Sequence, residues 1–222
     1  MEKIKVVVLS ANLGNFDTLV ENVKQELPSN VEVVFHTFTD VDFPPMTVAM
    51  APRMQYRIPK LFGWQMFPGY DYYIWLDGSM SLQNPQSVKW FLGQCRGDIA
   101  LFRHPWRKTV KEEVDHIEQK LQQNHKYMVP RYKNGLHKEQ YAECLADPKF
   151  KDKNLYTSTA FIYKNNKKVR EMLKEWWYYS SRYFTCDQVA LAYVVHKHEL
   201  KINVIEENQY NIPYMTLTSK HK

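Results

Sequence analysis

The sequence is poor in glycine and cysteine. Only 7 of its 222 residues are glycine, which argues against a multi-glycine phosphate loop of the Walker type. Its three cysteines, Cys95, Cys144 and Cys186, lie far apart and form no CxxC pair. Neither a disulfide framework nor a cysteine zinc site is therefore indicated, and a reducing compartment suits these thiols best.

Long apolar runs are also missing. The apolar run after the first lysines is shorter than the seven or so residues of a signal-peptide core, and no stretch approaches the ~20 apolar residues of a membrane helix. We therefore expect a cytoplasmic protein without a membrane span. Hydrophobic residues make up 44% and charged residues 24% of the chain, which is typical of a folded globular protein. The length fits one large domain or two small ones.

The positive charge is unevenly distributed along the chain. Residues 103–170 carry 16 basic and 8 acidic side chains, whereas residues 1–102 carry 8 and 10, and residues 171–222 carry 6 of each. A clustered basic region can hold a polyanion such as nucleic acid or an acidic glycan. The alternative is an ordinary solvated lysine-rich surface.

Hydrophobic periodicity predicts an alternation of strands and helices. Apolar runs predict strands at residues 4–9, 31–38, 71–76, 98–102, 157–163 and 201–205. Helical spacing predicts helices at residues 16–27, 110–121, 169–177 and 189–195. The second strand is bounded by Pro28 before it and by the stretch from Asp40 to Pro45 after it, and residues 124–156 are poorly periodic. The βαβ opening predicts an α/β domain with a mostly parallel sheet flanked by helices, without a clear domain boundary.

Two aspartates stand beside apolar segments. Asp77 follows the apolar run of residues 72–76 directly, where an open α/β sheet gathers its ligands and where a carboxylate could bind a hard divalent cation. The alternative is that Asp77-Gly78 is simply a turn. Asp187 begins an apolar helix, where it could act in catalysis or merely cap the helix.

Other polar residues follow the first and fourth strands. These positions, which suit a base, a ribose or a phosphate, are Ser10, Asn12, Asn15, Arg103 and His104. His196 and His198 do not share a helix face, so we interpret them as a surface pair. The aromatic cluster of residues 176–179 is interpreted as core.

These segments together resemble a known family. The stretches YDYYIWLDGSMSL, IALFRHPWR and CDQVALAYVV, in this order and after an Arg/Lys-bearing segment, are similar to the GT-A-fold glycosyltransferases. More closely, they resemble the glycosyltransferase-like family that includes plant mucilage-synthesis proteins. The resemblance is strongest over about residues 53–116 and 180–196.

The resemblance implies one Rossmann-like GT-A domain over residues 1–222, with a donor half at 1–102 and an acceptor half at 103–222. It implies a nucleotide-sugar donor, for which we expect a UDP-sugar carrying a hexose or pentose, and Mn²⁺ or Mg²⁺ as cofactor. Asp77 matches the first position of the family's DxD-like motif, but the third position is Ser79. Asp77 would therefore bind the metal together with the donor diphosphate, waters and His104 or a C-terminal histidine.

Individual residues receive roles from the same resemblance. Asp187 would serve as general base or stabilise the oxocarbenium-like centre, and Gln188 would orient a sugar hydroxyl. Arg57 or Lys60 would stabilise the diphosphate leaving group. The expected donor-binding residues are Ser10, Asn12, Asn15, Arg53, Arg57, Lys60, Asp77, Gly78 and Ser79, and those for the acceptor or a phosphate are Arg103, His104 and Arg107.

The acceptor remains open at this point. The basic third suggests a polyanionic acceptor, either a hydroxylated DNA base of the kind that bacteriophage sugar transferases modify or an acidic glycan. The alternative function is a non-catalytic nucleic-acid-binding module, which would use the aromatic residues interleaved with these basic residues, namely Trp106, Tyr127, Tyr132, Tyr141 and Tyr156. The sequence predicts no oligomeric state.

Overall fold

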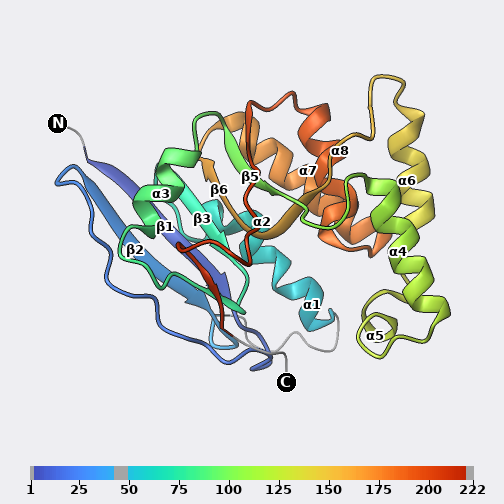
Figure 1. The fold of residues 1–222 in the computed structure, drawn as a ribbon, viewed down its shortest axis with the longest axis horizontal. Coiled ribbons are helices and arrows are strands. Elements are labelled where there is room, and N and C mark those ends of the chain that lie inside the picture. Colours follow the sequence, from blue (N-terminus) through green and yellow to red (C-terminus); the bar gives the residue numbers. More distant parts are fainter. Residues whose placement is uncertain (1–2, 43–49, 219–222) are drawn as a thin grey trace.

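A six-stranded mixed sheet forms the centre of the protein (Figure 1). The computed structural model describes residues 3–42 and 50–218. The strands, in their order across the sheet, are β2 (Val31–Phe38), β1 (Ile4–Ala11), β3 (Tyr72–Leu76), β6 (Tyr156–Lys164), β5 (Ile99–Arg103) and β7 (Ile202–Ile205). Strand β1 pairs in parallel with β2 and β3, and β5 in parallel with β7, whereas β6 runs antiparallel to both its neighbours. Five strands share one direction, which confirms the predicted mostly parallel α/β fold.

The strands divide their side chains between two apolar cores, because successive residues of a strand point to opposite faces. In β1, Val7 and Leu9 join one core, and Val6 and Val8 join the other. All four are at most 2% exposed. A strand that is buried on both faces reads as a continuous apolar run, which explains why β1 is recognisable in the sequence.

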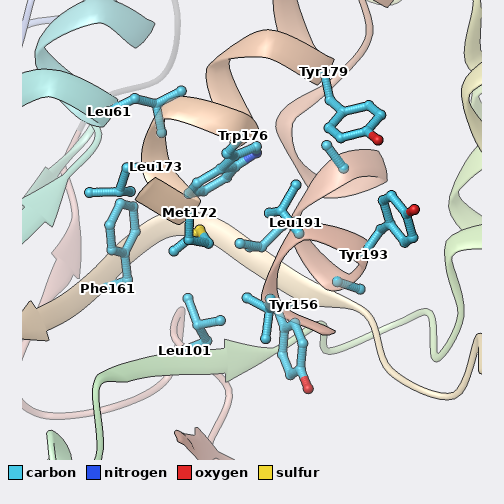
Figure 2. Packing of buried hydrophobic residues seen from close by; sticks show 14 of the residues in the cluster. Leu61, Leu101, Tyr156, Phe161, Met172, Leu173, Trp176, Tyr179, Leu191 and Tyr193 are labelled. Carbon is cyan, nitrogen blue, oxygen red and sulfur yellow. The ribbon is translucent and has the colours of Figure 1, made fainter. Parts of the chain in front are cut away.

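A layer of helices covers one face of the sheet. It contains α2 (Arg57–Met66), α4 (Val110–Gln122), α6 (His137–Ala146), α7 (Lys167–Tyr183) and α8 (Asp187–Lys197). Figure 2 shows Met172 and Trp176 of α7 packed between Phe161 of β6 and Leu191 of α8. Trp176 is fully buried, as expected of a core residue, whereas Tyr178 of the same cluster is 50% exposed.

The other face has a thinner cover. Helix α3 (Ser87–Gln94) lies against it (Figure 1) and buries Val88 and Phe91. A small antiparallel pair, β4 (Met80–Ser81) and β8 (Thr216–Leu217), completes this side and brings the C-terminal segment next to the end of β3. Neither α3 nor this pair was predicted from the sequence.

The predicted helix at residues 16–27 is wrong. In the structure this segment is irregular, and its backbone bonds to the segment after β4: Val23 N–H donates to the Leu82 carbonyl at 3.0 Å and Glu26 N–H to the Pro85 carbonyl at 2.8 Å. Phe16 and Leu19, read as the buried stripe of a helix, are 39% and 46% exposed. Hydrogen bonds to a distant segment therefore outweigh helical periodicity here. The parallel pairing of β1 and β2 is confirmed, but their connection is not helical.

The remaining predicted strands and helices are present with shifted ends. Thr109 caps α4 by accepting from Glu112 N–H at 3.1 Å, and Asn166 caps α7 by accepting from Val169 N–H at 2.9 Å. The poorly periodic region holds α5 (Val129–Tyr132) and α6, and helix α1 (Pro52–Gln55) precedes α2. Pro44 and Pro45 lie outside the described residues. Within residues 3–42 and 50–218, no helix is long and apolar enough to cross a membrane.

Candidate active site

Asp77 lies at the carboxyl end of β3, in the wall of a cavity of about 740 Å³. Its backbone N–H donates to the Thr159 carbonyl at 2.8 Å, and its own carbonyl accepts from Met80 N–H at 2.9 Å, so the expected turn is present. The side chain has a further role. Its Oδ1 accepts from the Trp75 indole at 2.8 Å and from Lys60 Nζ at 3.3 Å. Burial raises the pKa of Asp77, and Lys60 opposes this rise.

Asp187, at the start of α8, is buried in a cluster of donors. Its Oδ1 lies 2.5 Å from Arg57 Nε, and its Oδ2 lies 2.7 Å from Lys60 Nζ and 3.3 Å from the Tyr56 hydroxyl. No side chain caps α8; its N-cap residue is Cys186. Burial alone would raise the pKa of Asp187, but Arg57 and Lys60 outweigh it and lower the pKa to about 2. Asp187 is therefore a fully ionised partner of two buried cations, and it does not cap the helix.

Lys60 links the two carboxylates. The residue is 1% exposed, and its ammonium group contacts Asp187 and Asp77 from one side of α2. Burial lowers the pKa of Lys60, but the two carboxylates outweigh it, so the net shift is upward. The lysine is charged and holds the Asp77 carboxylate at the edge of the cavity. This link joins residues that are far apart in the sequence, and sequence reasoning did not anticipate it.

The predicted donor-binding residues separate into two groups. Those that line the cavity are Asn12, Arg53, Asp77, Gly78 and Ser79. Arg57 and Lys60 lie behind Asp77 and are at most 2% exposed, so they do not reach the cavity. Ser10 and Asn15 do not line it either, although both lie near the end of β1. A glycine is needed at position 78, because a Cβ there would lie 2.8 Å from the Ala11 carbonyl oxygen.

Asn12 and Arg53 shape two walls of the cavity. The Asn12 amide donates to the Asp17 carbonyl at 2.8 Å and accepts from Asp17 N–H at 3.0 Å, which folds the chain after β1 into a loop. The Arg53 guanidinium lies 3.9 Å from the ring centroid of Phe184 and donates to the Phe184 carbonyl at 3.2 Å. Burial is the main cause that lowers the pKa of Arg53 to about 10. Arg53 is thus a cation of the cavity wall.

The residues expected to contact the acceptor or a phosphate lie elsewhere. Arg103 binds Glu206 at 2.6 and 2.8 Å, and Arg107 pairs with Glu113. His104 Nδ1 accepts from the backbone N–H groups of Trp106 and Arg107 at 3.2 and 3.0 Å, and burial lowers the pKa of this imidazole to about 4. None of the three lines the cavity, and Gln188 does not line it either. Their predicted contacts with a ligand are therefore unsupported by their positions.

The cavity also contains residues that sequence reasoning missed or used differently. Residues not proposed for this site include Phe16, Asp17, Trp106, Tyr127, Arg131 and Tyr210. Trp106 and Tyr127 belong to the aromatic set considered for nucleic acid, but Tyr132, Tyr141 and Tyr156 of that set do not line the cavity. Trp106 was recoverable, because it lies three residues beyond the end of β5. Tyr210 belongs to a C-terminal segment without any motif, so only the fold brings it here.

The basic middle third lines a second cavity, of about 860 Å³. Its lysines are Lys149, Lys151, Lys153 and Lys197, and it shares no lining residue with the Asp77 cavity. Within residues 3–42 and 50–218, the charged residues of the Asp77 cavity are instead Asp17, Asp77, Arg53 and Arg131, whose formal charges sum to zero. The positive charge that stands out in the sequence is therefore not concentrated around Asp77.

Asp77 and Asp17 are the carboxylates of the Asp77 cavity. Among the described residues, no group of three or more histidine, cysteine, aspartate or glutamate side chains could hold a metal ion. Mg²⁺, however, is often held by one or two carboxylates together with substrate phosphates and water, and this donor set fits that kind of site. His104 is engaged by backbone donors, His196 and His198 face Asp147 and Glu175, and His221 lies outside the described residues.

One comparison with known proteins bears on this site. Residues 46–216 match the model of a family described as TOD1/MUCI70, glycosyltransferase-like domain. The matched region includes α1 and α2, the Asp77 turn, Trp106 and the start of α8. Among curated proteins, none matches the chain.

Proposed function

The chain belongs to the TOD1/MUCI70 family of glycosyltransferase-like domains, and from this premise we propose that it transfers a sugar from a UDP-sugar to a hydroxyl acceptor. In this reaction, the acceptor oxygen forms a bond to the anomeric carbon while the carbon–oxygen bond to the diphosphate breaks. The electron pair leaves with the diphosphate, and a base takes the proton of the acceptor hydroxyl. The family description supports the transferase function in general; the donor and the acceptor are part of this proposal.

The position of Asp77 carries the proposal. In open α/β sheets, ligands bind outside the carboxyl ends of the parallel strands. Asp77 lies at that edge, beside the loop that follows β1, in a cavity of about 740 Å³. Trp75 and Lys60 fix its carboxylate there, so the group is oriented before a ligand arrives.

Asp77, together with Asp17 in the same cavity, would hold a divalent cation, either Mn²⁺ or Mg²⁺. Such a cation stabilises the negative charge that develops on the leaving diphosphate. Among the chain's own cations, Arg53 would help to stabilise this negative charge. Arg57 and Lys60 are buried and do not line the cavity. We therefore assign Lys60 to the orientation of Asp77 and assign contact with the diphosphate to Arg53.

The catalytic role expected of Asp187 and Gln188 stays a prediction. A general base works best when its pKa lies near the working pH, and the pKa of Asp187 is about 2. Its two ion pairs favour a positioning role, in which Asp187 holds Lys60, and Lys60 holds Asp77. Asp187→Asn can separate the two roles, because loss of a catalytic base removes transfer and leaves Mn²⁺-dependent UDP binding intact, whereas loss of a positioning group also weakens that binding through Lys60 and Asp77.

The polyanionic acceptor, a hydroxylated DNA base or an acidic glycan, also stays a prediction, as does the alternative of a nucleic-acid-binding module. Both rest on the excess of lysine and arginine in residues 103–170, of which Lys149, Lys151 and Lys153 line the other cavity. A salt titration tests them, because each neutralised phosphate of duplex DNA contributes a slope of about −0.9 in log K against log salt. A flat profile would contradict both.

The proposed donor site can be tested by the thermal shift of the protein with UDP, with and without Mn²⁺. A ligand at ~100 times its Kd adds ~2.7 kcal/mol of stability, so the wild type should show a clear shift that Mn²⁺ enlarges. Asp77→Asn should lose the Mn²⁺-dependent part while remaining folded. Asp115→Asn is the matched control, because Asp115 is exposed, lies on α4 and is remote from the cavity lining. A full Mn²⁺-dependent shift in Asp77→Asn would refute the assignment.

A further inference from the structure

Two aromatic rings form a ridge at the rim of the Asp77 cavity. Trp106 and Tyr210 stack with ring centroids 5.6 Å apart and an angle of 12° between their planes. Both line the cavity, and they are nonetheless 67% and 40% exposed. The two residues come from distant segments, one after β5 and one after β7, so the fold brings them together at this place.

This exposure calls for a partner. Large aromatic side chains normally bury their faces, and exposed apolar groups beside a cavity with polar groups mark ligand-binding sites. Tyr178 shows what an ordinary exposed aromatic looks like in this protein. It is 50% exposed on α7, its hydroxyl accepts from Arg182 at 2.9 Å, and it lines neither cavity. The ridge differs in offering two stacked rings next to Asp77.

The segments that carry the ridge follow strands on one side of β3, and the loop after β1 follows a strand on its other side. Asp77 follows β3; β1 is the neighbour of β3 on one side, and β5 and β7 lie on the other. Phe16 and Tyr127, both contacted by Arg131, form one aromatic group of the cavity lining, and Trp106 and Tyr210 form another. If the donor occupies the group that holds Phe16, next to the loop after β1, the ridge is left for the second substrate. This step rests on the proposed function.

The charge of the cavity selects the chemistry of that substrate. A single-stranded nucleic acid needs a positively charged groove along its backbone in addition to aromatic platforms. Among the residues that the structure describes, the formal charges of the lining sum to zero, and the lysine-rich loop of residues 149–153 lines another cavity. An uncharged ring with one apolar face suits such a ridge. A pyranose presents that kind of face, because its C–H bonds gather on one side of the ring while its hydroxyl groups point outward.

We propose that the Trp106–Tyr210 ridge is the acceptor subsite and binds a neutral pyranose residue of a glycan, with the apolar face of the sugar on the indole. The ring would be held beside Asp77 without any ionic contact. Trp106 is then a residue that determines acceptor specificity, and Tyr210 positions its indole.

The test uses the complete protein and titrates neutral β-linked hexasaccharides of glucan, xylan and mannan type, followed by NMR. A short single-stranded DNA oligonucleotide is titrated in parallel. The variants are Trp106→Leu, which removes the aromatic face, Trp106→Phe, which retains one, and the control Tyr178→Leu. UDP binding is measured for every variant, which keeps the donor site under observation.

We expect at least one hexasaccharide to bind the wild type and Tyr178→Leu alike, without dependence on salt. Trp106→Leu should weaken that binding by about tenfold or more, and Trp106→Phe by only a few-fold. UDP binding should be unchanged in all of them. Absence of hexasaccharide binding to the wild type, or equal binding by Trp106→Leu, overturns the inference. Preferential, salt-dependent binding of the DNA overturns it in favour of nucleic acid. Absence of UDP binding to the wild type would instead refute the proposed donor function.

Discussion

Asp77 and Asp187 share one lysine but differ in almost everything else. The side chain of Asp77 is 28% exposed at a cavity, whereas that of Asp187 is 6% exposed and enclosed by α2 and α8. Burial raises the pKa of Asp77, while Arg57 and Lys60 overcome burial and lower the pKa of Asp187. The neighbours therefore decide what each carboxylate can do. One is available to a ligand, and the other is committed to the protein's own cations.

The largest effect on stability should come from Asp187→Ala. The substitution leaves Arg57 and Lys60 buried without their main counter-ion, and removal of one partner from a buried pair costs about 3–5 kcal/mol. Urea unfolding measures this loss as a lower midpoint. Asp115→Ala, which removes an exposed partner of Lys111, is the control and should change stability by less than about 1 kcal/mol. A variant as stable as the wild type would show that Asp187 is not committed in this way.

Lys60→Met should have the next largest effect, because it removes the link between the two carboxylates. Asp187 retains Arg57 at 2.5 Å, so we expect a loss of about 2–3 kcal/mol of unfolding free energy. Asp77 loses a cation at 3.3 Å, and its pKa should rise further. Carbon-detected NMR titration of the Asp77 carboxyl can follow this rise. An unchanged pKa of Asp77 would mean that Lys60 does not control it.

Asp187 should make the protein less stable as the pH falls into the acid range. Because its pKa in the folded protein is about 2 and its ordinary value is 3.8, ionised Asp187 stabilises the fold above pH 4, and this contribution disappears as the pH falls through 2. The loss amounts to about 2 kcal/mol. Denaturant unfolding curves can be recorded at about five pH values between pH 4.5 and pH 2. The free energy of unfolding should fall less steeply with decreasing pH in Asp187→Asn than in the wild type. Parallel declines in the two proteins would contradict this prediction. Asp77 has a raised pKa, so its protonation at acidic pH favours the folded state and has the opposite effect on stability.

Asp77→Asn should have the smallest effect on stability. The amide retains an oxygen for the Trp75 indole, and the lost charge was not favoured by burial, so we expect a change within about 1 kcal/mol. A thermal melt without ligand measures it, with the wild type as reference. A loss of stability as large as that of Asp187→Ala would mean that both aspartates stabilise the fold. It would contradict the conclusion that Asp77 is available to a ligand and Asp187 is not.

The sequence predicted the six strands of the central sheet, and most clearly β1, β3 and β5, which are largely buried and read as apolar runs. It also identified Asp77 and Asp187 as residues at element ends. It failed at residues 16–27, where bonds to the segment after β4 replace the helix. It also did not predict that Arg57 and Lys60, expected to bind the donor, are buried. Their distance from the cavity depends on how α2 packs, and local pattern carries no information about that.

The aromatic ridge was beyond sequence reasoning for a related reason. Tyr210 follows β7, the edge strand of the sheet, and reaches Trp106 only because β5 and β7 are neighbours. The prediction drawn from the basic third stays a prediction for a similar reason. Lys149, Lys151 and Lys153 line the second cavity and not the one with Asp77. Charge along a chain predicts a surface property, whereas its position relative to a site depends on topology.

The antiparallel strand β6 has a consequence for the order of folding. Strand β6 lies between β3 and β5. The edge of β3 that holds Trp75 opposite Phe161 is therefore unpaired until β6 has been synthesised. During synthesis, the chain up to residue 102 would expose one edge of β3, and β5 would have no neighbour, because both its partners come later. Unpaired edges promote association between chains, and pairing over such separations slows folding. The first 102 residues are therefore expected to aggregate when produced alone, because β3 and β5 find their missing neighbours only in the later part of the chain.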